Sequence, residues 1–343
     1  MKRLPLFLAA AAVSMSGFGL DQSPSLGPTT CARYATDAYP GFDSEDKIVN
    51  TAKKEPRWFG FWNGPKYDNA HDQYEWCKEL VKDESWSAAV KALDALVREW
   101  PAAAEAAKAQ EALAKINLDY LDDAEEAFAE YKYLLDYYSL SCDYAKTADI
   151  LYQIAGKMRL EGKTIMFFRF RNAVDVRRAY EACVLRAPGA MWTPEAMLTI
   201  GELREEDQDY TEAVKVYENL RNLHGGTKEA KRAVARESEA RMQLLKDHGY
   251  NRERTEDTIN FLELALRLCD DADRALIEEC YQEAKALIET EAWKAAKFYD
   301  SPTRTKRSAI NAYERYLKDY PDGEHAEEAK ARLEELKGSG ETP

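Results

Sequence analysis

One phrase of helical sequence occurs several times along this chain of 343 residues, and it restricts the fold more than any other feature. The stretches Ala88–Ile116 and Ser308–Leu336 align without a gap, so that Ala89 falls on Ala309, and a proline ends the first helix in both. Because apolar residues at offsets of four, seven and eight lie on one helical face, each copy predicts a helix with one buried side. Such a unit cannot bury that side alone, so we expect the copies to stack on one another.

The same pattern is found in the intervening sequence. It consists of a small residue, a large residue four later, an apolar residue at seven or eight, and a helix breaker at twelve. The copies are Ala89-Leu93-Leu96-Pro101, Ala127-Tyr131-Leu134-Ser139, Val176-Tyr180-Cys183-Pro188, Ala213-Tyr217-Leu220-Gly225, Ala309-Tyr313-Tyr316-Pro321 and the weaker Ile259-Glu263-Leu266-Asp271. Between them lie second amphipathic helices, which we expect at Glu105–Leu118, Tyr144–Leu160, Glu195–Leu203, Lys228–Leu245 and Ala275–Tyr299.

A repeat of two helices predicts an all-α fold, a right-handed α-solenoid. The best unit runs from Met197 to Leu220, with Gly201 twelve residues and Tyr210 three residues before Ala213. It resembles a tetratricopeptide repeat, in which small residues allow two helices to approach closely where they cross. We therefore expect about six helix pairs in residues 69–337, and the last helix, Glu324–Lys337, has the charged outer face that a cap requires.

The two ends of the chain differ from the repeats. Residues 1–19 have Lys2 and Arg3, then an apolar run and small residues, which is typical of a secretory signal peptide, although a disordered cytosolic N-terminus is the alternative. We expect residues 20–68 to form an irregular arm on the first repeat and residues 338–343 to form a disordered tail. No later segment has the length and hydrophobicity of a transmembrane helix. Cys31 lacks the preceding Leu-small-small sequence of a lipidation site, and both its position and its context disfavour lipidation there.

Residues that would carry chemistry are scarce. The formal net charge of −14 disfavours nucleic acid as a partner, because binding phosphates requires a basic face. Neither the four histidines nor the six cysteines have metal-ligand spacing, and no nucleophile has an assigned base. We therefore predict no catalytic, metal or cofactor site. Cys269 and Cys280 flank an expected turn and are the pair that we would test first for a disulfide, although buried free thiols are the simpler interpretation.

Aromatic and basic residues provide the candidates for protein binding, since binding surfaces are rich in both. Many tyrosines occur between residues 120 and 152, and an insertion at Gly162–Asn172 places phenylalanines among basic residues. The partner-binding candidates are Tyr120, Tyr131, Tyr152, Phe167, Phe168, Arg169 and Arg171. The alternative interpretation is that most of these tyrosines belong to the repeat core and that the arginines pair with neighbouring carboxylates.

Three stretches also resemble the BamD family, called YfiO in some bacteria. They are Ser85–Ile116, Ala179–Leu220 and Ala295–Leu333. The resemblance implies a non-enzymatic periplasmic lipoprotein at the inner face of the outer membrane, with a β-barrel assembly protein or unfolded outer-membrane proteins as partners in its concave groove. Two departures are the missing lipidation sequence and one helix pair more than that family's usual five. Another periplasmic adaptor, for example one that coordinates cell-wall synthesis with envelope constriction, remains an alternative.

Overall fold

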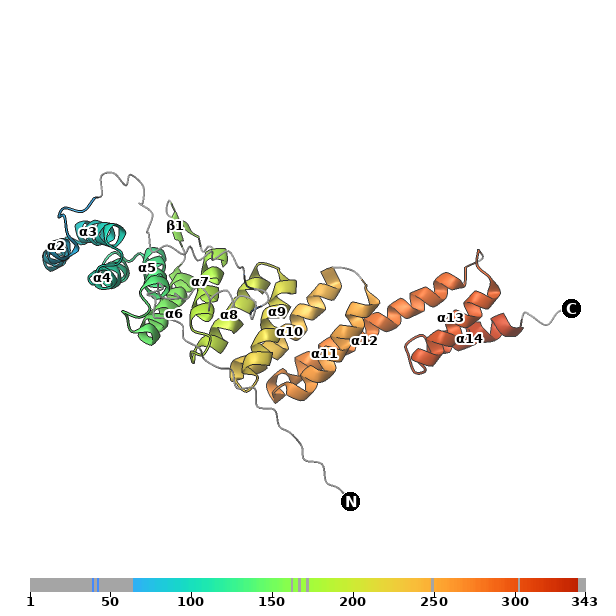
Figure 1. Cartoon of the computed structure of the whole chain (residues 1–343). Coiled ribbons are helices and arrows are strands. Elements are labelled where there is room, and N and C mark those ends of the chain that lie inside the picture. The colour runs from blue at the N-terminus through green and yellow to red at the C-terminus, as the bar shows by residue number, and fades with distance from the viewer. Residues whose placement is uncertain are drawn as a thin grey trace, which may run out of the picture.

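Helices follow one another in a single elongated row in this computed structural model (Figure 1). The structure describes residues 39, 42, 64–161, 163–165, 168–170, 173–247, 250–301 and 303–338. Within these ranges the helices are α2 (Ala70–Lys82), α3 (Trp86–Glu99), α4 (Ala106–Asp119), α5 (Ala124–Tyr137), α6 (Tyr144–Glu161), α7 (Ala173–Arg186), α8 (Thr193–Glu206), α9 (Tyr210–His224), α10 (Lys228–Asp247), α11 (Arg252–Leu268), α12 (Asp271–Tyr299), α13 (Lys306–Asp319) and α14 (Ala326–Gly338). Two short strands, β1 (Lys163–Ile165) and β2 (Phe168–Phe170), are inserted between α6 and α7.

Each helix packs mainly against the helices before and after it, as expected for an α-solenoid. The repeated phrase forms α3, α5, α7, α9 and α13. In these five helices the anchor residue and the residues four and seven positions later are buried. The prediction of an all-α solenoid of helix pairs is therefore confirmed, and the repeated phrase is the set of residues that join one helix to its neighbours.

The turns within the helix pairs also repeat. Glu84, Asp122 and Gln208 have positive φ angles of 56°, 52° and 61°, and each lies between the first and second helix of a pair. A left-handed residue here ends one helix and reverses the chain. The residues that follow Asp122 and Gln208 are aspartates that cap the next helix by accepting a hydrogen bond from a backbone N–H. The pairs thus share a turn as well as a core pattern.

The weakest copy of the phrase, in α11, predicts the wrong register. The pattern had placed Ile259 and Glu263 on the buried face, but Glu263 is exposed. The buried residues are instead Thr258, Leu262 and Ala265, which begin one position earlier. A threonine can occupy the small-residue position because its hydroxyl donates a hydrogen bond to the carbonyl oxygen of Arg254.

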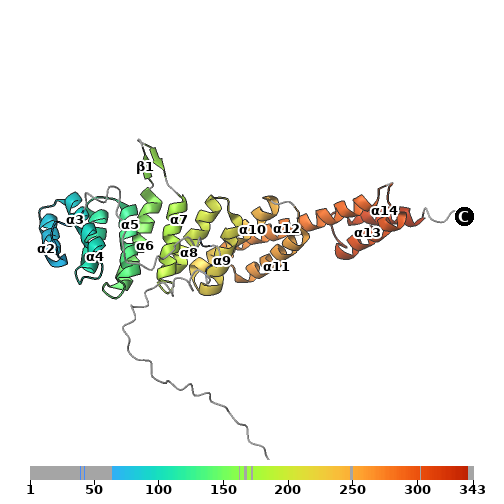
Figure 2. The same ribbon diagram turned by 45° about the horizontal axis from the view of Figure 1, so that its top comes forward.

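Helix α12 has 29 residues, against 20 in α10, 17 in α11 and 14 in α13. At 1.5 Å per residue it extends over roughly 43 Å. Its first half packs in a hydrophobic cluster with α10 and α11, whereas Trp293 and Ala296 in its second half pack with α13 and α14. Helices α13 and α14 therefore pack with the second half of α12 and are joined to the rest mainly through that one continuous helix (Figure 2).

The described residues of the N-terminal arm lie in two places. Lys66 and Tyr67 contact α2 of the first repeat, as expected, because their backbone N–H groups donate hydrogen bonds to Oε1 of Gln73. By contrast, Tyr39 and Phe42 stack with their ring centroids 5.2 Å apart and pack against the hydrophobic cluster of α4–α10. The first repeat has a separate cluster formed by α2–α4. Residues 1–19, Cys31, Gly162, Phe167, Arg171 and residues 339–343 lie outside the described ranges, as do the predictions made for them.

Cys269 and Cys280 are both free thiols, so the candidate disulfide between them is not formed. Cys269 ends α11 and its thiol donates a weak hydrogen bond to the carbonyl oxygen of Leu266. Cys280 lies nine residues after Asp271, the start of α12, or roughly 14 Å along the helix axis. The two residues flank the turn as expected, but α12 extends past it before Cys280 is reached, and both side chains pack in the apolar cluster.

Candidate protein-binding surfaces

The predicted partner-binding tyrosines have very different environments. Tyr131 is 4% exposed and belongs to the core that α5 forms with its neighbours, so it is a structural residue rather than a surface candidate. Tyr152 on α6 is half-buried and stacks on Trp192, with ring centroids 4.6 Å apart and planes 4° from parallel. Burial and the nearby carboxylate of Glu195 raise its pKa. Tyr120 is 53% exposed, which leaves it as the described tyrosine candidate best placed to meet a partner.

Tyr120 belongs to a surface that we call the aromatic edge, made of Trp86, Tyr120, Leu121 and Leu160. The rings of Trp86 and Tyr120 stack with centroids 3.8 Å apart. An ion pair between Asp122 and Lys157 brings the turn that carries Tyr120 and Leu121 against the end of α6. Leu160, one turn along α6 from Lys157, is 85% exposed. The ion pair thus joins the turn that exposes Tyr120 and Leu121 to the helix that exposes Leu160, and exposed apolar side chains are typical of interaction surfaces.

The β1–β2 hairpin follows directly after Leu160 and projects from the row of helices (Figure 2). Its strands are antiparallel, with Lys163 opposite Phe170 and Ile165 opposite Phe168. Within the described residues neither strand has a second neighbour, so each has a free edge. Phe168 and Arg169 lie in β2, so these two candidates belong to the hairpin that follows Leu160 of the aromatic edge in the sequence.

A second surface consists of charged residues that link the first helices of successive pairs. On α6, Arg159 donates hydrogen bonds of 3.2 Å to Thr199 and 3.0 Å to Glu202, both on α8. Arg232 and Arg236 on α10 then pair with Glu202 and with Glu205 respectively. These contacts link α6, α8 and α10, and a partner that binds here would have to compete with them.

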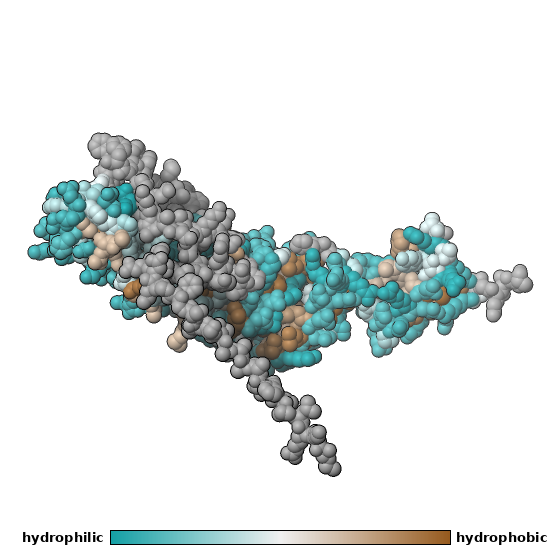
Figure 3. Space-filling view, viewed as in Figure 1, coloured by the Kyte–Doolittle hydropathy of each residue, from teal (hydrophilic) through white to brown (hydrophobic). Residues whose placement is uncertain are grey.

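Hydrophobic surface is not continuous on the face shown in Figure 3. Most of its coloured surface is hydrophilic, and hydrophobic residues form separate patches over the middle of the molecule. Among the described residues, no group of three or more His, Cys, Asp and Glu side chains could hold a metal ion. No helix within those residues is long and apolar enough to cross a membrane.

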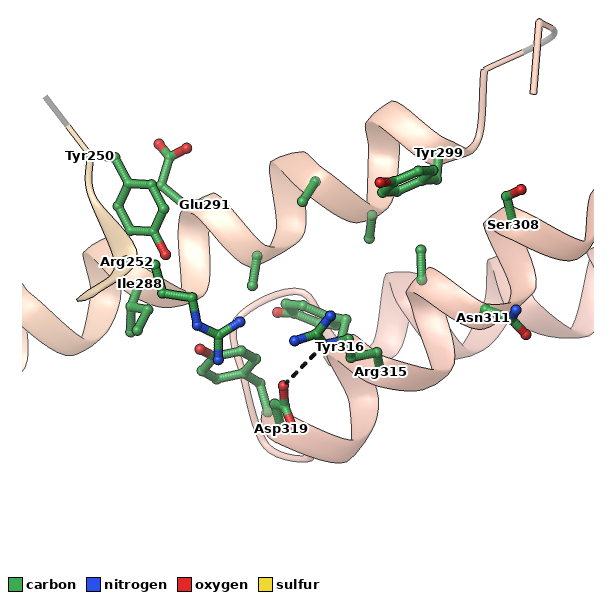
Figure 4. Close-up of a pocket in the computed structure, with 15 residues that line it drawn as sticks. Tyr250, Arg252, Ile288, Glu291, Tyr299, Ser308, Asn311, Arg315, Tyr316 and Asp319 are labelled. Atoms are coloured by element: carbon green, nitrogen blue, oxygen red, sulfur yellow. Dashed lines mark ion pairs between the residues drawn. The ribbon is translucent and has the colours of Figure 1, made fainter. Parts of the chain in front are cut away.

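A groove of about 520 Å³ lies between the second half of α12 and α13, with Tyr250 and Arg252 at one end (Figure 4). Small residues form much of its wall, which leaves the space between the two helices unfilled. These residues are Ala292, Ala295 and Ala296 from α12 and Ser308 and Ala312 from α13. Tyr299 and Tyr316 add aromatic surface, and the hydroxyl of Tyr316 donates a hydrogen bond of 2.8 Å to Glu289.

Charged residues of both signs surround this groove. Arg252 pairs with Glu256 at 2.7 Å, and Arg315 lies 4.0 Å from Asp319, the pair drawn in Figure 4. Burial raises the pKa of Tyr320, and the charge of Arg252 opposes that rise. The groove thus combines an apolar wall with polar groups at its margin, as interaction sites commonly do.

Sequence reasoning did not find this groove. Most of its residues come from the last repeat, where the sequence phrase predicts buried core residues and does not indicate a groove. The signal that could have found it is the helical pattern of α12, which continues for 29 residues and includes Ala292, Ala295 and Ala296.

Comparison with known proteins supports the assignment of the repeats. Residues 195–227, which cover most of α8 and all of α9, match the tetratricopeptide repeat family. No curated protein sequence matches the chain.

Several solved structures are similar to this chain. The C-terminal part of a TPR repeat-containing protein from Cytophaga hutchinsonii has 15% identity and a TM-score of 0.30, covering 77% of this chain and 88% of that chain. A tetratricopeptide repeat protein from Parabacteroides merdae has 14% identity and a TM-score of 0.26, with coverages of 78% and 98%. A chain in the structure of Naa15/Naa10 bound to HypK-THB has 15% identity and a TM-score of 0.25, with coverages of 75% and 43%.

Proposed function

We propose that this chain, a solenoid that contains a tetratricopeptide repeat, is a non-enzymatic scaffold that binds other proteins. The observation that carries the proposal is the aromatic edge, where Tyr120 and Leu160 expose apolar surface and a hairpin follows whose strands have no further neighbour among the described residues. Apolar side chains supply binding free energy when a partner covers them. Free strand edges can add a further strand from an extended polypeptide. The two features together suit a partner segment in the extended conformation.

We further propose that the scaffold works in the periplasm as a BamD-like component of the machinery that assembles outer-membrane β-barrels. Support comes from the signal-peptide pattern in residues 1–19 and from the three stretches that resemble that family. Precursors of β-barrel proteins consist largely of strand segments with alternating apolar residues. Such segments are of the kind that the aromatic edge and the hairpin would accept.

Cross-linking in the cell envelope tests this function. A photoreactive side chain would replace Tyr120, and a control would replace Lys115, which is exposed within α4, before the turn between α4 and α5 that carries Tyr120. We expect position 120 to cross-link to a β-barrel assembly protein or to an outer-membrane precursor, and position 115 to do so much less. Recovery of cell-wall synthases alone would discard the barrel-assembly role and favour the adaptor of cell-wall synthesis. Retention of the whole protein in the cytosol would contradict the proposed location.

A further inference from the structure

The groove between α12 and α13 lies at a position of the repeat that is covered in the other copies. The five strong copies of the repeated phrase can be compared residue by residue from their anchors. The residue three positions after the anchor is buried in four of them. These residues are Ala92, Glu130, Ala179 and Val216. The corresponding residue of the last copy, Ala312, is only half-buried.

The first two repeats show what fills this space elsewhere. In α2, the side-chain amide of Gln73 donates a hydrogen bond of 3.1 Å to the carbonyl oxygen of Ala92. In α4, Gln110 donates one of 2.8 Å to the carbonyl oxygen of Glu130. Both glutamines are fully buried. Beside Ala312, the groove is lined on α12 by Ala292, Ala295 and Ala296.

The residue six positions after the anchor shows that a whole helix is also missing here. In α5 this residue is Tyr133, which is half-buried and packs against the cluster of α2–α4, that is, against the preceding repeat. In α13 it is Arg315, whose side chain is 72% exposed. The difference follows from the length of α12, because α11 packs against its first half and so does not cover the second half.

From these positions we infer that the α12–α13 groove binds an amphipathic helix of a partner protein. Within this chain, the space in front of a repeat is filled by helices, and a helix from outside would complete the same interface. The groove is lined on α12 from Ile288 to Tyr299, which is about three helical turns at 3.6 residues per turn. The helix would place small or aliphatic residues at i, i+3, i+4 and i+7 against the alanines. Its polar margin would meet Arg252 and Arg315.

This site is distinct from the aromatic edge, and it does not depend on which protein binds there. The test begins with the full-length protein carrying benzoylphenylalanine in place of Ala295 in its own cells. We expect a cross-link that maps to an amphipathic helical segment of another protein. A synthetic peptide of that segment is then measured against the purified chain by fluorescence anisotropy.

Two exposed alanines of α12 give a matched pair of variants for this measurement. Ala295→Arg puts a long charged side chain into the groove, whereas Ala286→Arg changes α12 outside it. We expect the first to weaken peptide binding at least roughly tenfold and the second to leave it within about twofold, with equal helix content by circular dichroism. The inference would be overturned by equal effects of the two variants, by a cross-link to a second copy or to the chain's own N-terminal arm, by a cross-link to an extended segment, or by no cross-link at all.

Discussion

Replacing Gly201 by alanine should destabilise the protein, although alanine is the better helix former. Gly201 lies in the interior of α8, where the exchange alone should stabilise the helix by about 1 kcal/mol. A Cβ atom added there would lie 2.2 Å from Cε1 of Tyr217 and less than 3.0 Å from two more atoms of the same ring. Tyr217 is fully buried in the core, so its ring has no free space into which it can move.

Overpacking of a well-filled core costs about 1–3 kcal/mol, and the three short contacts place this site at the upper end. With the gain in helix propensity subtracted, we expect Gly201→Ala to lower the free energy of unfolding by roughly 2 kcal/mol. With a urea dependence near 2 kcal/mol per molar, the midpoint of unfolding by circular dichroism should fall by roughly 1 M.

Gly156 provides a matched control within the same fold. It lies inside α6, and a Cβ atom there would approach only the hydroxyl of Tyr180, at an ordinary contact distance of 3.8 Å. Gly156→Ala should therefore raise the free energy of unfolding by up to about 1 kcal/mol. Adding Tyr217→Leu to Gly201→Ala should relieve the clash and give a favourable coupling energy of about 1 kcal/mol or more. Equal stabilisation by both glycine variants would refute the argument that α8 and α9 need a glycine where they meet.

Three further predictions follow from burial and charge. The bidentate hydrogen bonds from Arg332 lower the pKa of Asp300, so this contact stabilises the last repeat above about pH 4 and is lost as the pH falls further. Asp300→Asn should therefore reduce the fall of the urea midpoint at low pH. An unchanged fall would contradict a role of this contact in stability. Tyr131→Ala should lower the free energy of unfolding in urea by about 3–5 kcal/mol because it empties a core position, whereas Tyr120→Ala should lower it by less than about 1 kcal/mol. Similar losses for the two variants would contradict the assignment of Tyr131 to the core and Tyr120 to the surface. Burial raises the pKa of the Cys77 thiol to about 12, so iodoacetamide at pH 8 should modify it only after unfolding, and modification of the native protein, read by mass spectrometry, would contradict its burial.

The sequence alone was sufficient for the architecture because the repeat pattern is a property of neighbouring residues. The phrase around Ala213, with Gly201 before it, requires two helices that cross closely, and several copies of it require stacking. The phrase misled only in α11, where a threonine took the small-residue position. There the choice between Thr258 and Ile259 depended on which residue faced the next helix, and a single sequence does not contain that information.

The candidate surfaces depended on tertiary structure. Tyr120 and Tyr131 look alike in sequence, yet one lies in an open turn and the other under neighbouring helices. No pattern linked Asp122 to Lys157, whose contact across 35 positions joins the turn that carries Tyr120 to α6. The groove shows the same limit, since Ala312 occupies the same place in its phrase as Ala92. Local spacing determines which face of a helix is apolar, but only the packing of distant helices decides whether that face is covered, because coverage depends on where the preceding repeat ends.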